Sequence, residues 1–587
     1  MKETLLIICL LFSITVFSQQ TQEESFSYER EWATYLPHIN TANTVVDFFT
    51  LSDNSLFFFS THQASMPFLD NLYPFPPDAE GNLTVGALNL EGQLEWVDKF
   101  RLGEETTSVY NVTIDEDDYI YFVGRTRDSL HIGTPGTHMP EYIPHFYNDT
   151  VYVGGQEVIG NFPGYAHFIA KYDTSGNQIW GSYIVGEKSM SSIGRVVKQG
   201  DFLYYYGSTN SKSGIATPGT YISTAPAPLP PEITETYTVS FIMKFDANTG
   251  ERLWGTYFPI HELDFTFNTS GNARPAIDSA GYAYFNYINT FIKLNPDGTY
   301  NSTLSNSDNL IYDFIIQFDS EGNIYTLARN KPNDNTNFGT AGTYKPNKTI
   351  EDEHLLIKLT PNFEKIWATY LGSTVGATYE TMIINEWDNE ILISSSTALA
   401  DNTTPNAFQT EYGGGDLDAV LMSFDMETGQ RNWFSYYGDS ETDRGNRLIL
   451  ADEHSFYFTG LSEGGDNIIS EESLYTSEDF GVWYGHIQIP FVAKFTSTKT
   501  SSVDELPRDT FKVYPNPSSD KVFVESVSQW RNDISLALYT LQGKYLTTEV
   551  QATGTGYAID MSKLPAGFYL LKVSTADGAA HYKLIKE

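Results

Sequence analysis

The stretch FIAKYDTSGNQIWGSYIVG, residues 168–186, reads as two short β-strands joined by a tight turn. Apolar residues lead into Asp173, Ser175 and Gly176, and a second strand follows that carries Trp180. Asp and Asn side chains bond to nearby backbone groups, and Gly tolerates the positive φ that such turns need. We therefore predict a β-hairpin with a large aromatic side chain on its second strand.

The same hairpin is repeated along the chain. FIMKFDANTGERLWGTYF stands at 241–258 and LMSFDMETGQRNWFSYYGD at 421–439. Trp367 lies in a copy without the Gly, and a further copy keeps Gly298 but has Ser302 in place of the Trp. In four copies a Trp follows a Gly by four residues: Gly92/Trp96, Gly176/Trp180, Gly250/Trp254 and Gly429/Trp433. Such repetition indicates an array of similar supersecondary units.

A second pattern, a strand rich in Tyr and Phe, supports the same conclusion. It occurs seven times, beginning at residues 55, 119, 202, 282, 323, 390 and 455. The first Trp strand, at 30–37, has no partner strand before it, and the last apolar strand, at 490–497, has no Trp strand after it. If these two strands pair, the array closes into a ring and its open edges disappear.

We therefore predict an all-β fold in which residues 19–497 form a seven-bladed β-propeller, closed by 30–37 pairing with 490–497. Large aromatic rings would pack between neighbouring units, where they bury the most area. Each unit would hold four strands, for example 168–173, 178–185, 194–200 and 202–209.

The N-terminus has the layout of a secretory signal peptide. Lys2 precedes an apolar run from Leu5 to Phe17, and small Ser18 suits cleavage before Gln19. The run is shorter than the roughly 20 residues of a membrane-spanning helix, and no later segment is apolar enough to span. The only cysteine, Cys9, lies in this run, so the chain after residue 18 has neither thiol nor disulfide.

The C-terminus begins after a polar linker, 498–509, and contains several short strands that predict a small Ig-like β-sandwich over 510–587. Its motif residues are Tyr514, Pro515, Asn516, Pro517, Gly543, Gly567 and Tyr569. This segment resembles the type A C-terminal sorting domain of the type IX secretion system. The resemblance implies export to the periplasm, contact with the secretion machinery, passage across the outer membrane, and a final place on the outer cell surface or in the medium.

The repeats also resemble the bacterial β-propeller repeat family known as SBBP. Residues 412–445 match best, and loop signatures such as TPGTH at 134, TPGTY at 217, TAGTY at 340 and TPNAFQ at 404 agree. The resemblance implies a propeller fold and an extracellular setting. It implies no catalytic residues.

Composition narrows the range of functions. The net charge is −39, and residues 510–587 are nearly neutral, with eight basic and seven acidic side chains, so the body is strongly acidic. Such a field repels phosphate backbones, so we expect no nucleic-acid partner. The acidic run 115–118 has oxygen ligands of the kind that Ca²⁺ prefers, although acidic turns are usually only solvated. We find no sequence motif for a metal site, a nucleophile or a phosphate-binding loop, and we expect no cofactor.

Long loops after the aromatic strands are the candidate ligand-binding region, because variable loops on a rigid scaffold often carry recognition. Their aromatic side chains are suited to stack on sugars or to fill a partner's pocket: Phe68, Tyr73, Phe75, Tyr142, Phe146, Trp483 and Tyr484. The alternative is that they cover the blade ends. The sequence favours a binding or adhesion module for glycan or protein; a polysaccharide hydrolase or lyase, or a structural surface component, stays open.

Overall fold

The computed structural model is entirely β in its described part. It describes residues 27–36, 46–61, 83–103, 107–142, 146–153, 156–186, 194–209, 211–226, 239–258, 275–287, 290–305, 310–330, 336–349, 353–372, 379–398, 403–465, 467–476, 479, 488–498, 510–526, 534–540, 545–546, 550–553, 556–575 and 578–586. Every secondary-structure element in these ranges is a strand, from β1 to β38. Within the same ranges, no helix is long and apolar enough to cross a membrane.

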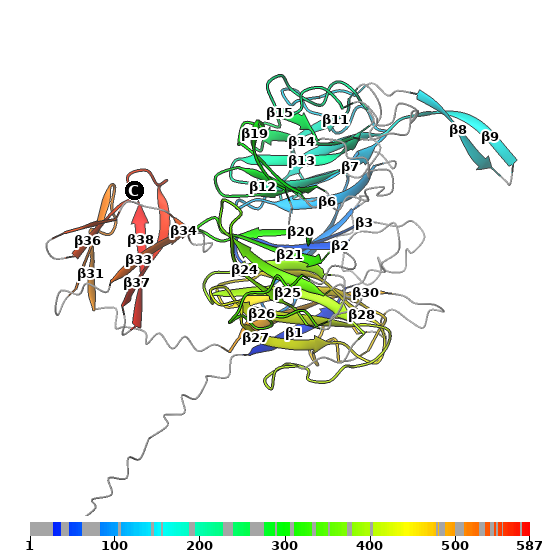
Figure 1. Ribbon diagram of the computed structural model, residues 1–587. Helices are drawn as coiled ribbons and strands as arrows, with labels where there is room; N and C mark the ends of the chain where they lie inside the picture. Colours follow the sequence, from blue (N-terminus) through cyan, green and yellow to red (C-terminus); the bar gives the residue numbers. More distant parts are fainter. Residues whose placement is uncertain are drawn as a thin grey trace, which may run out of the picture.

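Between residues 28 and 497 the described strands form seven four-stranded antiparallel sheets in a propeller-like arrangement (Figure 1). Sheet 1 contains β2 (Val46–Thr50), β3 (Leu56–Thr61), β4 (Leu83–Leu88) and β5 (Leu94–Phe100). Sheet 2 contains β6 (Ser108–Ile114), β7 (Ile120–Thr126), β10 (Ala166–Tyr172) and β11 (Gln178–Ile184). Sheet 3 contains β12 (Arg195–Gln199), β13 (Phe202–Thr209), β14 (Val239–Asp246) and β15 (Arg252–Tyr257).

Sheets 4 to 7 follow the same plan. Sheet 4 contains β16 (Ala276–Ile277), β17 (Ala283–Tyr287), β18 (Thr290–Leu294) and β19 (Tyr300–Ser305), and sheet 5 contains β20 (Leu310–Phe318), β21 (Ile324–Asn330), β22 (His354–Leu359) and β23 (Lys365–Tyr370). Sheet 6 contains β24 (Tyr379–Asn385), β25 (Glu390–Thr397), β26 (Asp418–Asp425) and β27 (Arg431–Tyr437). Sheet 7 contains β28 (Asp443–Leu450), β29 (Ser455–Ser462), β30 (Ile489–Ser497) and β1 (Tyr28–Tyr35). A separate hairpin of β8 (Phe146–Val153) and β9 (Gln156–Pro163) projects from the body (Figure 1).

The seventh sheet joins the two ends of the body. Strand β1 pairs antiparallel with β30, so that Ala33 lies opposite Ala493 and Tyr35 opposite Phe491. The sequence predicts pairing of 30–37 with 490–497, and the described part of the ladder within these segments runs from Arg30 opposite Phe495 to Tyr35 opposite Phe491. Contacts then link every sheet to the next: Ser52–Asp118, Trp180–Ala247, Trp254–Pro296, Tyr284–Phe318, Trp367–Met426, Tyr28–Glu390 and Trp32–Leu90.

The division of the repeat into sheets differs from the sequence prediction. The four strands expected in one unit fall into two sheets, because 168–173 and 178–185 correspond to β10 and β11, whereas 194–200 and 202–209 correspond to β12 and β13. The aromatic strand β13 pairs with the hairpin that follows it, with Tyr205 opposite Met243. A sheet therefore combines the second half of one sequence repeat with the first half of the next.

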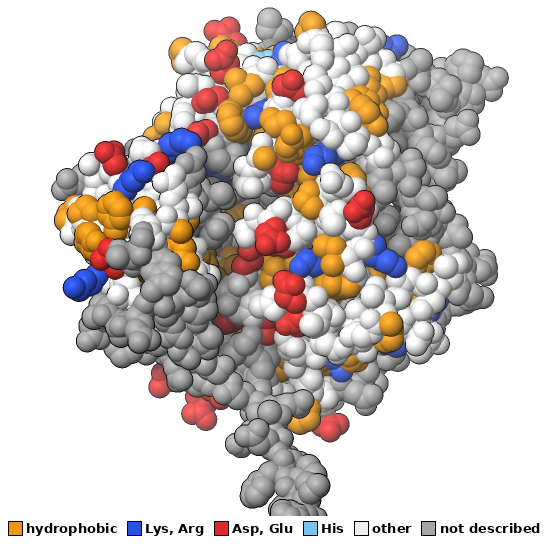
Figure 2. Space-filling view, turned by 60° about the vertical axis from the view of Figure 1, so that its left-hand side comes forward, with side chains coloured by type: hydrophobic (Ala, Val, Ile, Leu, Met, Phe, Trp, Pro, Cys, Tyr) orange, Lys and Arg blue, Asp and Glu red, His pale blue; other side chains and the backbone are white. Residues whose placement is uncertain are grey.

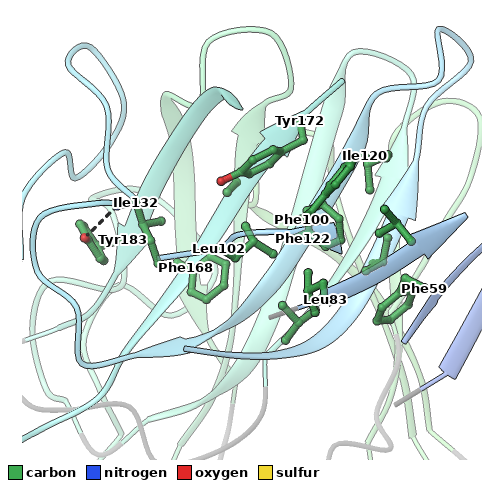
Figure 3. Packing of buried hydrophobic residues seen from close by; sticks show 14 of the residues in the cluster. Phe59, Leu83, Phe100, Leu102, Ile120, Phe122, Ile132, Phe168, Tyr172 and Tyr183 are labelled. Carbon is green, nitrogen blue, oxygen red and sulfur yellow. Dashed lines mark hydrogen bonds between the residues drawn. The ribbon is translucent and has the colours of Figure 1, made fainter. Parts of the chain in front are cut away.

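The core lies between adjacent sheets, where aromatic and aliphatic side chains interlock. Figure 3 shows the layer between sheets 1 and 2, with Phe59, Leu83 and Phe100 facing Phe122 and Phe168. The same layer includes Tyr172, which stacks near Phe100 at a centroid distance of 6.4 Å. Burial of such rings is the main stabilising contribution in a chain without disulfides.

Four of the repeated turn glycines, Gly92, Gly250, Gly298 and Gly429, pack against a tryptophan from the preceding sheet, whereas Gly176 packs against Phe100. A Cβ added to Gly250 would lie 2.8 Å from the Trp180 ring, and Gly298 and Trp254 are related in the same way at 2.7 Å. The indole nitrogen of Trp180 donates a hydrogen bond to the carbonyl oxygen of Ala247, at 3.0 Å, in the same turn. The Gly and the Trp of one sequence copy therefore belong to two different contacts.

The C-terminal part contains two further four-stranded sheets around one core. The sheets are β31 (Phe511–Tyr514), β32 (Lys521–Ser526), β36 (Gly556–Asp560) and β35 (Val550–Ala552); and β34 (Tyr545–Leu546), β33 (Ser535–Thr540), β37 (Gly567–Thr575) and β38 (Gly578–Lys586). Val522, Val524, Leu571 and Leu584 are fully buried in this core. We refer to residues 510–587 as the C-terminal domain.

Candidate functional site

The structure describes only part of the predicted ligand-binding set. Phe68, Tyr73, Phe75, Trp483 and Tyr484 lie outside the described residues. Phe146 is the first residue of β8, and its side chain is likewise not described.

Tyr142 is the one predicted binding residue whose side chain is described. It is only 4% exposed and belongs to the core between sheets 1 and 2. Its hydroxyl donates a hydrogen bond to the carbonyl oxygen of Gly164 at 2.6 Å. In this structure Tyr142 therefore packs a loop onto the core and offers no face to a ligand.

The predicted sorting motif is attached to the last strand of the chain. The Asn516 side chain accepts a hydrogen bond from the backbone nitrogen of Ile585, at 2.8 Å, and donates one to the carbonyl oxygen of Lys583, at 2.7 Å. Tyr569 is buried, and its hydroxyl donates to the carbonyl oxygen of Pro565 at 2.7 Å. Tyr514, Pro515 and Pro517 flank Asn516, Gly567 begins β37, and Gly543 is outside the described residues.

The two faces of the body differ in the strand connections that they carry. In every sheet, the connection between the second and third strands leaves on one side, which we name the loop face. The short turn after the first strand lies on the other side, the turn face, together with the turn after the third strand in sheets 1 to 6. The hairpin β8–β9 belongs to the loop face. The body's ends, Tyr28 and Ser497, are paired at the turn face, and Figure 1 shows the C-terminal domain on that side.

A cluster of arginine and tyrosine side chains lies at the loop face of sheet 2. Arg125, at the end of β7, is exposed, and its guanidinium carbon is 4.5 Å from the ring centroid of Tyr165 and 5.4 Å from that of Tyr110. The guanidinium of Arg127 lies 4.3 Å from the same Tyr165 ring. We name these four residues the Arg125 site.

Local structure fixes both the tyrosine and the arginine positions. The ladder between β6 and β7 shifts between Val109 and Asn111, so Tyr110 sits at a bulge, a feature that re-aims a side chain. Directly after Arg125, the Thr126 hydroxyl bonds the Thr107 hydroxyl at 2.7 Å and accepts the Asp128 backbone N–H at 2.9 Å. The chain therefore cannot swing freely where the arginines leave the strand.

The positive charge of Arg125 has no matching carboxylate among the described residues. Its partner across the ladder is His167, which is fully buried and shares a hydrogen bond with the Tyr205 hydroxyl. Burial, together with the nearby charge of Arg125, lowers the pKa of His167 to about 3, so this imidazole is neutral at pH 7. The site therefore presents a cation and aromatic faces, which suit a carboxylate or sulfate group on a ring-shaped ligand.

The sequence does contain a signal for this site. The strand copy at 119 ends in GRTRD, whereas the positions equivalent to Arg125 in sheets 3 and 6 are Ser208 and Ser396, both buried. A pattern search for aromatic side chains in loops does not detect it, because Tyr110 and Tyr165 lie at strand ends.

Two buried carboxylates have raised pKa values of the kind found in catalytic pairs, but a substrate cannot reach them. Burial raises the pKa of Asp418 to about 6 and that of Asp443 to about 7. Both side chains have zero exposure, and each accepts a backbone hydrogen bond, from Gly413 and Asp439 respectively. Because a substrate cannot touch them in this structure, their place is in the seam between sheets 6 and 7.

The acidic run 115–118 is used within the fold. Asp115 accepts a hydrogen bond from the Tyr121 hydroxyl at 2.7 Å, and Asp118 accepts one from the Ser52 hydroxyl at 2.6 Å. Among the described residues, no group of three His, Cys, Asp or Glu side chains is placed to hold a metal ion.

Comparison with known proteins identifies the C-terminal domain. Residues 512–587 match the family model described as "Secretion system C-terminal sorting domain". The chain therefore carries an export signal that directs it through the type IX secretion system to the cell surface or the medium. No curated protein matches the chain.

Solved structures show remote likeness to the body. The quinohemoprotein alcohol dehydrogenase of Comamonas testosteroni is 12% identical, with 84% of this chain and 79% of that chain covered and a TM-score of 0.37. The Pan2 WD40 domain of Neurospora crassa is 9% identical, with 81% and 97% covered and a TM-score of 0.38. At these scores, the propeller-like description rests on the sheets and their closure rather than on the likeness.

Proposed function

We propose that the chain is an exported seven-bladed β-propeller that binds a glycan through its loop face. In this proposal a signal peptide, 1–18, is removed before Gln19, residues 19–497 form the propeller, 498–509 are a linker and 510–587 form an Ig-like sandwich that serves export. The closed ladder between β1 and β30 supports the seven-bladed ring, and the repeats are of the SBBP type.

The observation that carries the binding proposal is the Arg125 site. Arg125 is exposed, is framed by two tyrosine rings and meets no described carboxylate, in a chain whose net charge is −39. Its charge therefore stays available to a ligand, in contrast to that of Arg447, which is paired with Asp47. The chemistry fits a polysaccharide that carries carboxylate or sulfate groups, with sugar rings against Tyr110 and Tyr165.

Titration of the chain from residue 19 onward against acidic and neutral polysaccharides tests the proposal. We expect an acidic polysaccharide to bind, and Arg125→Ala to weaken binding by about tenfold or more, as expected for the loss of a charge-assisted hydrogen bond. Arg431→Ala is the matched control, because Arg431 also lies over aromatic rings, Tyr344 and Phe434, but at the start of β27 on the turn-face side.

Equal loss of affinity in both variants, or binding of neutral and acidic polysaccharides alike, would count against the Arg125 site. Analysis of the polysaccharide after incubation separates binding from hydrolysis or lyase activity. If no polysaccharide binds, a protein partner or a structural role at the cell surface takes the place of the proposal.

A further inference from the structure

One turn on the turn face differs from the equivalent turns of the other sheets. The turn between β24 and β25 consists of residues 386–389, with the sequence EWDN, and contains Trp387. In five other sheets the last paired residues of the first two strands are separated by five residues, one more than in sheet 6, and the central residue is polar or small: Asp53, Asp117, Ala280, Glu321 and Glu453. Sheet 6 therefore differs from these five sheets in carrying a large aromatic ring at this turn.

The Trp387 turn is firmly braced. The Asn385 side chain accepts the Trp387 backbone N–H at 3.1 Å and donates to the carbonyl oxygen of Glu453 at 3.0 Å. Asp388 is paired with the His454 ring at 2.9 Å. Sheets 6 and 7 therefore hold the indole in a fixed position at the surface of the body.

The indole contacts the C-terminal domain. The rings of Trp387 and Tyr539 are stacked, with centroids 4.3 Å apart and planes 30° from parallel. Tyr539 lies on β33 next to Leu538, which is buried in the C-terminal core. Because neighbouring strand residues point to opposite sides, Tyr539 faces outward from its own domain.

Charges around the stacked rings are complementary. Lys572 lies on β37, opposite Ala537 of β33, and so shares the outward face of this sheet with Tyr539. Burial raises the pKa of Glu453, and the positive charges of His454 and Lys572 counteract that rise. Figure 2 shows this side of the molecule, with Asp and Glu side chains on the body beside the C-terminal domain.

We propose that the Trp387 turn is a docking site for the chain's own C-terminal domain, with Tyr539 as the anchoring residue on the outer face of β33 and β37. The docked arrangement keeps the C-terminal domain against the turn face of sheets 6 and 7 and leaves the loop face open. Removal of the C-terminal domain uncovers Trp387 and the acidic side chains around it.

Cross-linking in the full chain from residue 19 tests this docking. The only cysteine, Cys9, precedes that start, so two introduced cysteines are the only thiols. We expect Glu453→Cys with Lys572→Cys, which leave Trp387 and Tyr539 in place, to be joined by a short bis-maleimide at least about tenfold faster than Ser175→Cys with Lys572→Cys, because docking raises the local concentration of one thiol near the other. Ser175 lies in the exposed turn between β10 and β11, on the same face but in sheet 2. Equal rates for the two pairs would overturn the proposal.

Hydroxyl-radical footprinting gives a second measurement without cysteines. We expect Trp387→Ala to increase oxidation of Tyr539 severalfold and to leave Phe568 unchanged. Phe568 is a suitable internal control because it lies on the same sheet, is 48% exposed and contacts Lys583 rather than the body. Oxidation of Tyr539 that is the same in the wild-type chain and the variant would contradict the docking.

Discussion

At the scale of single residues, the recurring contact is a tryptophan from one sheet against the turn of the next. Trp180, Trp254 and Trp367 each donate an indole hydrogen bond to a carbonyl oxygen in the following sheet. A lysine accompanies two of these contacts, because Lys244 and Lys358 donate to the carbonyl oxygens of Pro296 and Met426 as well. The turn glycines leave the room that the indoles fill.

Replacement of such a glycine is expected to destabilise the body through a collision. Gly250→Ala places a Cβ 2.8 Å from Trp180 at a φ of +71°, whereas Gly136→Ala, at +93°, meets nothing within 4 Å. Strain at positive φ costs about 1–2 kcal/mol, and overpacking adds about 1–3 kcal/mol. Denaturant unfolding should therefore show a larger loss for Gly250→Ala than for Gly136→Ala; equal losses would mean that Trp180 moves away freely.

The buried Asp443 predicts a dependence of stability on pH. Its pKa is about 7 in the folded protein, above the value near 3.9 in an unfolded chain, so the folded state binds the extra proton between these values. The stabilisation is present at low pH and is lost as the pH rises through about 7. We expect Asp443→Asn to gain stability relative to the wild type when the pH is raised from 5 to 8. Thermal unfolding at both pH values measures this gain, with the exposed Asp416→Asn as control. A constant difference between the wild type and Asp443→Asn would contradict it.

Part of this residue-level pattern is readable in the sequence. The spacing of Gly92, Gly176, Gly250 and Gly429 from the Trp residues indicates a hairpin, and the hairpins exist. The spacing does not reveal which aromatic side chain packs against each Gly, because that side chain lies in the preceding sheet, one whole repeat away. The contacts of Lys244 and Lys358 cannot be predicted from the sequence either, because their acceptors lie in the next sheet. In addition, a lysine in an apolar strand is usually exposed, whereas these two are almost completely buried.

At the scale of elements, the pairing of β1 with β30 closes the ring of sheets. The sequence does not show, however, where one sheet ends and the next begins. A run of hairpins and aromatic strands can be divided into sheets in two ways, and each gives four strands per repeat. The choice depends on which neighbour the aromatic strand bonds, and the ladder of β13 with β14 settles it for sheet 3. The loop 131–167 also contains a hairpin, β8–β9, that the sequence suggests only as a loop.

Deletion of β1 is expected to open the ring. Residues 27–36 supply the fourth strand of sheet 7 and Trp32, which packs on Gly92 of sheet 1. Their loss exposes the edge of β30, and exposed edges promote association between chains. Size-exclusion chromatography and thermal unfolding should show aggregation or a much lower midpoint.

The matched control is replacement of 146–163 by a short linker, because β8 and β9 pair only with each other among the described strands. We expect this variant to stay monomeric with a nearly unchanged midpoint. If loss of β1 is as mild as loss of the hairpin, the β1–β30 ladder does not hold the ring.

At the scale of the whole molecule, the two faces separate two tasks. The Arg125 site lies at the loop face, and the C-terminal domain is on the side of the turn face (Figure 1). Sequence reasoning finds the export domain because its motifs are local and ordered along the chain. It does not find the Arg125 site, whose side chains come from β6, β7 and the residue before β10 and meet only after folding.

This separation predicts that the export domain does not affect ligand binding. A chain that ends at residue 498 should bind the acidic polysaccharide with the same affinity as the full chain, within about twofold. Parallel titrations of the two chains measure the difference. A large gain in affinity on removal of the C-terminal domain would mean that this domain reaches the loop face.

The ladder between β1 and β30 also sets an order of events during synthesis of the chain. Ala33 is synthesised long before its partner Ala493, which follows only after nearly all of the body. Until β30 is present, β1 has no strand to pair with. The ring therefore stays open, however many of the other sheets have formed. The C-terminal domain follows β30 almost directly. The ring can therefore close only shortly before the domain that directs export is present.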